Sequence, residues 1–203
     1  FRAAGLVEGR TIVTDNRFAD GDTSRLPGII GDLLKDGVDV IVTVGTSVTD
    51  SARRATTSVP IVSFANVDPV AAGLADQLGR PTGNVTGVLI APDGSLAAKR
   101  LSLLREAAPA AARIALLAPT GDPFFALQVR ESEAAARAIG VDLVVVSVGR
   151  EGYAEAFAEV ERRGAQALLV GSHQFFVRDR RIIIAAAERL RLAAMYEWRH
   201  QVE

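Results

Sequence analysis

Short apolar runs without polar alternation, separated by stretches of helical periodicity, constrain the fold of this chain more than any other feature. A half-buried strand alternates apolar and polar residues, whereas a strand buried on both faces forms a continuous apolar run. Runs of the continuous kind, mostly rich in Val, Ile and Leu, recur along the sequence. They span residues 38–44, 60–64, 85–90, 114–118, 143–148, 167–170 and 192–196. The pattern predicts parallel sheets that are covered on both faces.

The stretches between these runs carry apolar residues at helical spacing. Residues 24–35 place Leu26, Ile30 and their neighbours on one face, and Gly37 follows as a stop signal. Further helices are predicted over 96–108, 122–139, 151–163 and 175–189. Strands that alternate with helices in this way form βαβ units, so we predict an α/β fold with doubly wound, Rossmann-like sheets.

A turn-forming segment, Arg-Pro-Thr-Gly-Asn at residues 80–84, separates two series of these units. We therefore expect a first lobe over residues 1–87 and a second lobe over residues 88–203, with a cleft between them. Both ends of the sequence are predicted to be incomplete. The chain opens on the tail of a helix that a strand should precede, and the strand that ends at Tyr196 has no element after it.

Composition and missing motifs exclude several functions. Lys and Arg number 23 against 24 Asp and Glu, so no basic field suits nucleic acid. The absence of cysteine removes thiolate nucleophiles, and the two histidines, His173 and His200, are too few for a His-rich metal site. No dinucleotide fingerprint, phosphate-binding loop or nucleophile elbow occurs. We therefore predict no catalytic residue, no metal and no cofactor.

Candidate ligand-binding residues follow from the strand ends. In open parallel sheets, ligands bind beyond the carboxyl ends of the strands, where loops lead into helices. The residues predicted to bind ligand at these ends are Gly45, Thr46, Ser47, Asn66, Asp68, Asp122, Phe124, Ser172, His173 and Glu197.

The Gly45-Thr46-Ser47 loop is the most suggestive of these. Glycine lets a ligand approach the backbone, and hydroxyls with exposed N–H groups at a helix start suit a carboxylate or another anion. The alternative is that Ser47 only caps the helix it opens. Asp68 also has two interpretations, as a helix cap or as a partner for an ammonium group. Phe124 either lines a pocket or packs in the core.

An ordered set of motifs runs along essentially the whole chain. These are LVEGRTI at 6–12, RLP at 25–27, VDVIV at 38–42, GTS at 45–47, ATTSVPIV at 55–62, DPV at 68–70, RPTGNVTG at 80–87, KRL at 99–101 and EAAAR at 133–137. The set resembles the ABC-transporter substrate-binding family related to the tryptophan/tyrosine-type binding proteins.

The resemblance implies a type I periplasmic-binding fold with a hinge, which we expect around Gly87. It implies a protein that is no enzyme and that captures a small molecule, such as an amino acid or a similar small polar or aromatic solute. Family members are exported with a signal peptide, often as lipoproteins, and deliver their ligand to an ABC permease in the inner membrane. We therefore expect a periplasmic or extracytoplasmic monomer. Further chain should complete the first lobe.

For the site, the resemblance implies ligand contacts at 45–47 and at Asp68. We expect the second lobe to close over the ligand with groups near Asp122, His173 and Glu197. Two other classes stay open. A ligand-sensing regulatory domain on the same fold would carry a DNA-binding helix pair in a longer N-terminus. A doubly wound enzyme, such as a racemase or isomerase, would need a pair of acid/base groups that face the cleft.

Overall fold

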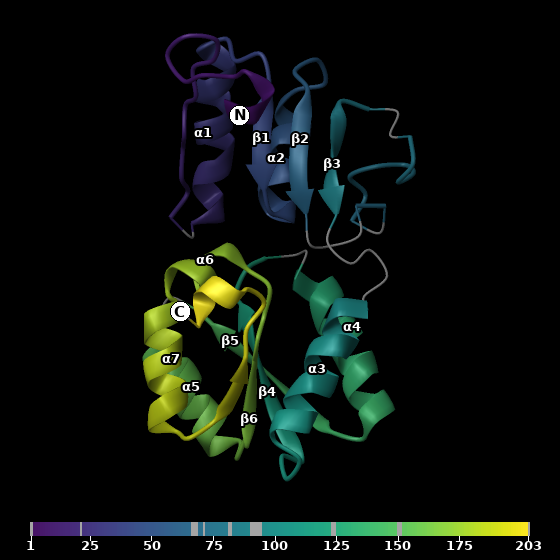
Figure 1. Ribbon diagram of the computed structural model, residues 1–203, viewed down its shortest axis with the longest axis vertical. Coiled ribbons are helices and arrows are strands. Elements are labelled where there is room, and N and C mark those ends of the chain that lie inside the picture. The colour runs from purple at the N-terminus through teal and green to yellow at the C-terminus, as the bar shows by residue number, and fades with distance from the viewer. Residues whose placement is uncertain are drawn as a thin grey trace.

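Two parallel sheets organise the computed structural model of the protein (Figure 1). The three-stranded sheet has the order β1-β2-β3, and the four-stranded sheet has the order β5-β4-β6-β7. We call the part of the chain around the first sheet, up to residue 89, the first lobe, and the part from residue 95 the second lobe. The predicted α/β fold with parallel sheets is confirmed. The structure describes residues 2–20, 22–65, 69–70, 72–80, 83–89, 95–122, 125–149 and 152–202.

The first lobe packs α1 and α2 against one face of its sheet. Leu26 and Ile30 of α1 pack with Ala52 of α2 and with the strand residues Ile41 and Ile61. The prediction of a helix over 24–35 corresponds to a short 3-10 turn that leads directly into α1. The elements are 3-10 turns at Arg2–Ala4 and Thr23–Arg25, α1 Leu26–Lys35, β1 Ile41–Val44, α2 Thr46–Ala55, β2 Ile61–Ala65 and β3 Val85–Leu89.

The second lobe has helices on both faces of its sheet (Figure 1). One apolar cluster joins the sheet to α3 and α4, and the other joins it to α5 and α7. The elements are α3 Ser95–Ala107, β4 Arg113–Pro119, α4 Phe125–Ile139, β5 Asp142–Val148, α5 Tyr153–Arg162, β6 Ala167–Val170, α6 Gln174–Arg178, α7 Arg180–Arg189, β7 Ala193–Met195 and a 3-10 turn at Arg199–Gln201.

The continuous helix predicted over 175–189 is wrong, because the chain breaks at Asp179 into α6 and α7. The Asp179 carboxylate accepts hydrogen bonds from the Tyr153 hydroxyl at 2.9 Å and from Arg178. Its backbone N–H bonds to the Phe175 carbonyl, and its own carbonyl accepts from Ile182. A single residue therefore ends one helix and starts the next, and the helical periodicity of the sequence runs through the break.

The two sheets differ in how well they are covered. In the second lobe every residue of β6 is buried. In the first lobe β1 alternates, with Ile41 and Thr43 buried and Val42 and Val44 exposed. The prediction that sheets are covered on both faces is therefore wrong for the first sheet within this chain, where Val42 is 66% exposed.

β3 shows where the first sheet ends along the sequence. It pairs with β2 as far as Ala65 and Leu89, so the predicted lobe boundary after Gly87 falls inside a strand. A side chain at Gly87 would overlap the Ser63 backbone, so glycine is needed there for close strand packing. The division of the chain at this residue stays a prediction.

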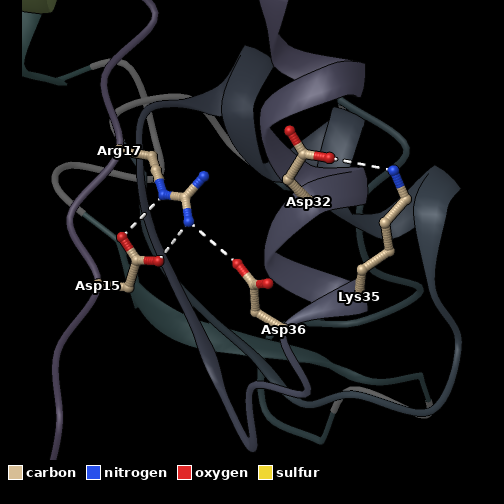
Figure 2. A network of polar contacts seen from close by, with 5 residues as sticks. All are labelled: Asp15, Arg17, Asp32, Lys35 and Asp36. Carbon is tan, nitrogen blue, oxygen red and sulfur yellow. Dashed lines mark hydrogen bonds and ion pairs between the residues drawn. The ribbon is translucent and has the colours of Figure 1, made fainter.

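The segment before α1 is held by exposed ion pairs (Figure 2). The Arg17 guanidinium lies 2.6 Å from the Asp15 carboxylate and 3.0 Å from the Asp36 carboxylate, just after α1. Lys35 and Asp32 form a further pair along α1. Solvent screens exposed pairs of this kind, so they orient the segment more than they stabilise the fold.

Candidate ligand-binding site between the two lobes

The carboxyl ends of strands from both lobes meet at the boundary between the lobes. The arrowheads of β1, β2 and β3 point toward the second lobe in Figure 1. The Ser47 hydroxyl, at the start of α2, donates a hydrogen bond to the Asp122 carboxylate beyond β4 at 2.7 Å. The Gln174 side chain, beyond β6, donates to the carbonyl of Val44 at the end of β1. The strand ends singled out by the sequence are thus brought together.

Gly45 allows the two lobes to approach closely. Its φ of 102° lies in the region that favours glycine, and a side chain there would overlap the Gln174 amide. Gly45 is also the N-cap of α2, which has no side-chain cap. Ser47 therefore does not cap this helix, and its hydroxyl is engaged across the lobe boundary with Asp122.

Thr46 presents a buried oxygen with no partner. The residue is 5% exposed, and its Oγ1 has no hydrogen-bond partner within the described part of the chain. An unsatisfied buried hydroxyl costs about 1–3 kcal/mol. It lies in the first turn of α2, where backbone N–H groups also lack helical acceptors. This combination suits an anionic or polar ligand group.

A buried set of hydroxyls supports this loop from behind. Thr49 Oγ1 donates to the Gly45 carbonyl at 2.9 Å and lies 2.8 Å from Thr43 Oγ1 and from Ser63 Oγ. A hydroxyl has one proton to donate, so Thr43 and Ser63 donate to Thr49. The loop is therefore fixed by neutral hydrogen bonds. Sequence reasoning missed these residues, although Thr43 and Ser63 are polar residues within apolar strand runs.

Asp122 and His173 form the polar centre on the second-lobe side. His173 Nε2 lies 3.5 Å from Asp122 Oδ2, and both side chains are largely buried. His173 Nδ1 accepts from the Phe175 N–H, which places the ring proton on the nitrogen that faces Asp122. His173 therefore caps α6 and orients the carboxylate that binds Ser47 of the first lobe.

The loop after β6 is held from two sides. Gln128 of α4 donates to the Ser172 carbonyl and accepts from the Ser172 N–H, both at 2.9 Å. Arg100 of α3 donates to Ser172 Oγ at 3.3 Å and to the Val170 carbonyl. It also reaches the Met195 carbonyl at 3.5 Å, at the end of β7. Neither Arg100 nor Gln128 was predicted as part of the site.

Glu197 is a half-buried residue just beyond β7. Burial raises its pKa, while a hydrogen bond with Ser172, the positive charge of Arg100 and a hydrogen bond with Trp198 lower it. Burial also lowers the pKa of Arg100, to about 10, so this side chain stays charged at neutral pH. The Glu197 Oε1 atom is buried and has no hydrogen-bond partner among the residues that the structure describes.

Three predicted site residues, Asn66, Asp68 and Phe124, lie outside the described residues. The sequence did contain a signal for one residue that was missed. Arg100 lies next to Leu101 and one turn before Leu104, on the face of α3 that is buried in the core. A cation on the apolar face of a helix needs a partner. No comparable signal points to Gln128, since glutamine is common on helix surfaces.

A cavity of about 360 Å³ lies elsewhere, lined in part by Arg53, Thr57, Asn84 and Val85. It sits near the carboxyl end of α2 and the start of β3, at the opposite end of the strands from the lobe boundary. None of the predicted site residues lines it. In the described ranges, no group of three or more acidic or histidine side chains is placed to hold a metal ion. No described helix has the length and apolar character to cross a membrane.

Two α/β lobes whose strand ends face each other across a polar boundary define the class of two-lobed solute-binding folds. The chain belongs to the ABC transporter substrate binding protein family, whose family model matches residues 1–193. The family resemblance inferred from the sequence motifs is confirmed.

Individual relatives agree with this assignment. A tyrosine-binding protein of Clostridioides difficile (strain R20291) is 31% identical over 125 residues, which cover 62% of this chain and 35% of that protein. The chain thus spans about a third of the length of this curated relative in the match. The crystal structure of an ABC domain in complex with L-Trp from Streptococcus pneumonia is 21% identical, with a TM-score of 0.86 over 98% of this chain and 67% of that one.

A third relative has a lower structural similarity. The ligand-free, open structure of a substrate binding protein with adhesive properties from Clostridium difficile is 24% identical. It superposes with a TM-score of 0.57 over 99% of this chain and 67% of that one. At these identities the two solved structures establish the fold of this chain, a type I periplasmic-binding fold.

Proposed function

We propose that this chain forms the ligand-binding lobes of the solute-binding component of an ABC importer. In this proposal it captures an amino acid, or a similar small polar or aromatic solute, between its lobes and carries out no reaction on it. One observation carries the proposal. Each lobe presents a buried oxygen without a partner in the described structure, Thr46 Oγ1 in the first and Glu197 Oε1 in the second.

The two sides of the boundary have complementary polarity. The first lobe offers the Thr46 hydroxyl and the N-terminus of α2, which favour a carboxylate. The second lobe offers the carboxylates of Asp122 and Glu197, which favour an ammonium group. A free amino acid carries a carboxylate and an ammonium group bonded to the same carbon atom. The tyrosine-binding relative and the L-Trp complex favour an aromatic amino acid.

We further propose that ligand capture closes the lobes about the hinge that we expect around Gly87. The structure is more similar to the L-Trp complex, with a TM-score of 0.86, than to the ligand-free, open protein, with a TM-score of 0.57. The match covers 67% of each of these two relatives. Because the lobes share one fold, a difference of this size supports a different arrangement of the lobes. The Ser47–Asp122 and Gln174–Val44 hydrogen bonds would then be closing contacts.

The remaining proposals concern the complete protein. We expect an exported, extracytoplasmic monomer that delivers its ligand to an ABC permease, as in the family. The exposed apolar face of the first sheet supports the expectation that further chain completes the first lobe, because parallel sheets are normally covered on both faces.

The test is isothermal titration of amino acids into the complete protein, with Thr46→Ala and a matched control, Thr57→Ala. Thr57 is an exposed threonine of the same lobe that lines the distant cavity. We expect saturable binding that Thr46→Ala weakens by about 10- to 100-fold, the loss of a hydrogen bond to a charged group. Loss of binding in Thr57→Ala but not in Thr46→Ala would place the ligand in the distant cavity and contradict the proposal.

A further inference from the structure

Arg100 is a buried cation on the face of α3 that packs in the core. The residue is 7% exposed and lies beside Leu101 and Leu104, which pack in the apolar cluster of the second lobe. A buried charge is costly unless it is fully paired and hydrogen-bonded. The Nε atom of Arg100 has no hydrogen-bond partner in the part of the chain that is described. Fold stability alone therefore gives a poor account of this side chain.

The guanidinium joins the ends of two neighbouring strands at the lobe boundary. It donates to the carbonyl of Val170, the last residue of β6, and to the carbonyl of Met195, the last residue of β7. It also donates to Ser172 Oγ. The loops that follow these strands carry Ser172, His173 and Glu197, which the sequence predicts as ligand-binding residues. Arg100 thus fixes the two loops of the site that follow β6 and β7.

Arg100 also lowers the pKa of Glu197, together with the hydrogen bond from Ser172. It is the charged group that acts on this carboxylate, and the other two partners of Glu197, Ser172 and Trp198, are neutral. Ser172 Oγ accepts from Arg100 and donates its own proton to the Glu197 carboxylate. Burial works in the opposite direction and favours the protonated, neutral carboxyl group. Without Arg100, only hydrogen bonds from neutral groups would counteract the rise that burial causes in the pKa of Glu197.

We propose that Arg100 is a positioning residue of the ligand site, which keeps Glu197 ionised and in place so that the second lobe selects ligands with a positively charged amino group. The inference rests on the proposed function and deepens it, because it assigns the amino group of the ligand to Glu197. If Arg100 only stabilised the fold, its replacement would change the affinity for all ligands by the same factor.

The first arm of the test compares an amino acid with its deaminated analogue. L-tryptophan is paired with indole-3-propionate, and L-tyrosine with 3-(4-hydroxyphenyl)propionate, by titration into the complete protein. We expect the wild type to prefer the amino acid by at least about 10-fold, the size of one charge-assisted hydrogen bond. Arg100→Met and Glu197→Gln should both abolish this preference, and Arg100→Lys should retain most of it. An equal loss of affinity for both members of a pair in Arg100→Met would overturn the proposal.

The second arm needs no ligand. The carboxyl carbon of Glu197 is followed by NMR in protein labelled with ¹³C-glutamate, and its signal is assigned by its absence in Glu197→Gln. We expect an ionised carboxylate at pH 7 in the wild type and a larger protonated fraction in Arg100→Met. Equal ionisation in the two proteins would overturn the role of Arg100. If no amino acid binds, the proposed function fails while this arm still decides the inference.

If Arg100→Met does not fold, Ser172→Ala takes its place in both arms. It removes the hydroxyl between Arg100 and Glu197 while both charged side chains remain. We expect a shift in the same direction, toward a protonated Glu197 and a weaker preference for the amino acid. An unchanged preference together with unchanged ionisation would contradict the proposal.

Discussion

The two lobes arise from the same sequence pattern, yet they reach different degrees of completeness. In the second lobe, strand β4 is buried from Ile114 to its end, and helices cover both faces of the sheet. In the first lobe Val42 and Val88 are 66% and 59% exposed, although they belong to equally apolar runs. A continuous apolar run indicates that both faces of a strand are buried in the folded protein. It does not indicate which part of the chain buries them.

The lobes also differ in how they hold their site loops. The first lobe uses neutral hydroxyls, with Thr49 at the centre of a hydrogen-bonded group. The second lobe uses charged and amide side chains, namely Arg100, Gln128 and Glu197. Threonine and serine hydroxyls carry no titratable charge, whereas Glu197 does, and burial raises the pKa of its carboxyl group. We therefore expect the contribution of the first lobe to be independent of pH and that of the second lobe to depend on it.

The largest predicted effect concerns the core of the complete lobe. Leu116→Ala removes a side chain that is buried in β4 between two layers of the second lobe. We expect a loss of about 2–5 kcal/mol in the free energy of unfolding, because the cavity adds to the lost apolar burial. Urea unfolding measures it. A loss below 1 kcal/mol would show a core that can collapse around the gap.

The exposed face of the first lobe gives the second prediction. In the complete protein, Val42→Thr should destabilise the fold by about 1–3 kcal/mol, since it would bury a hydroxyl under the proposed covering segment. Val13→Thr is the control, because Val13 is 88% exposed and lies in the segment before α1. Equal, small effects of the two substitutions would contradict the expectation that further chain covers this face.

The contact between the lobes gives the third prediction. Gly45→Ala places a side chain where φ is 102° and where the Gln174 amide packs. We expect ligand affinity to fall by about 10-fold or more, because the overlap with Gln174 opposes closure of the lobes and overpacking costs about 1–3 kcal/mol. The double variant Gly45→Ala, Gln174→Ala should recover only the part of the loss that comes from the overlap. Full recovery would mean that the backbone conformation of Gly45 carries no strain.

The smallest predicted effect is the pH dependence of stability. Burial raises the folded-state pKa of Glu197 above its ordinary value of 4.5. Stability from this group is therefore fully present below pH 4.5 and is lost as the pH rises through the raised pKa. Glu197→Gln should accordingly raise the Tm near neutral pH by at most about 2–4 °C. The difference should vanish below the ordinary pKa, and a constant difference at all pH values would contradict the assignment.

Much of this structure could be predicted because it depends on local patterns. Apolar runs located the strands of both sheets, and the strand-end rule located Ser47, Asp122 and His173, which meet at the lobe boundary. The break at Asp179 could not be predicted, since it depends on the Tyr153 hydroxyl from another helix.

Some supporting residues of the site could not be predicted from the sequence either. Gln128 clamps the Ser172 backbone across a separation of 44 residues, and only the fold brings them together. Ser47 was interpreted as a helix cap or a ligand contact, and its bond to Asp122 depends on the arrangement of two lobes. Patterns within one element reveal which residues are candidates, whereas contacts between elements decide what they do.

We propose that a ligand bridges the two lobes and draws them together. This chain contains no cysteine, so spin labels can be placed at Lys35→Cys on α1 and Glu106→Cys on α3, both exposed. Distances between the labels are measured in the complete protein with and without L-tryptophan or L-tyrosine. We expect ligand to shift the distribution to one short distance, and Thr46→Ala and Glu197→Gln each to weaken this shift. A distribution that amino acids leave unchanged would show that the ligand does not draw the lobes together.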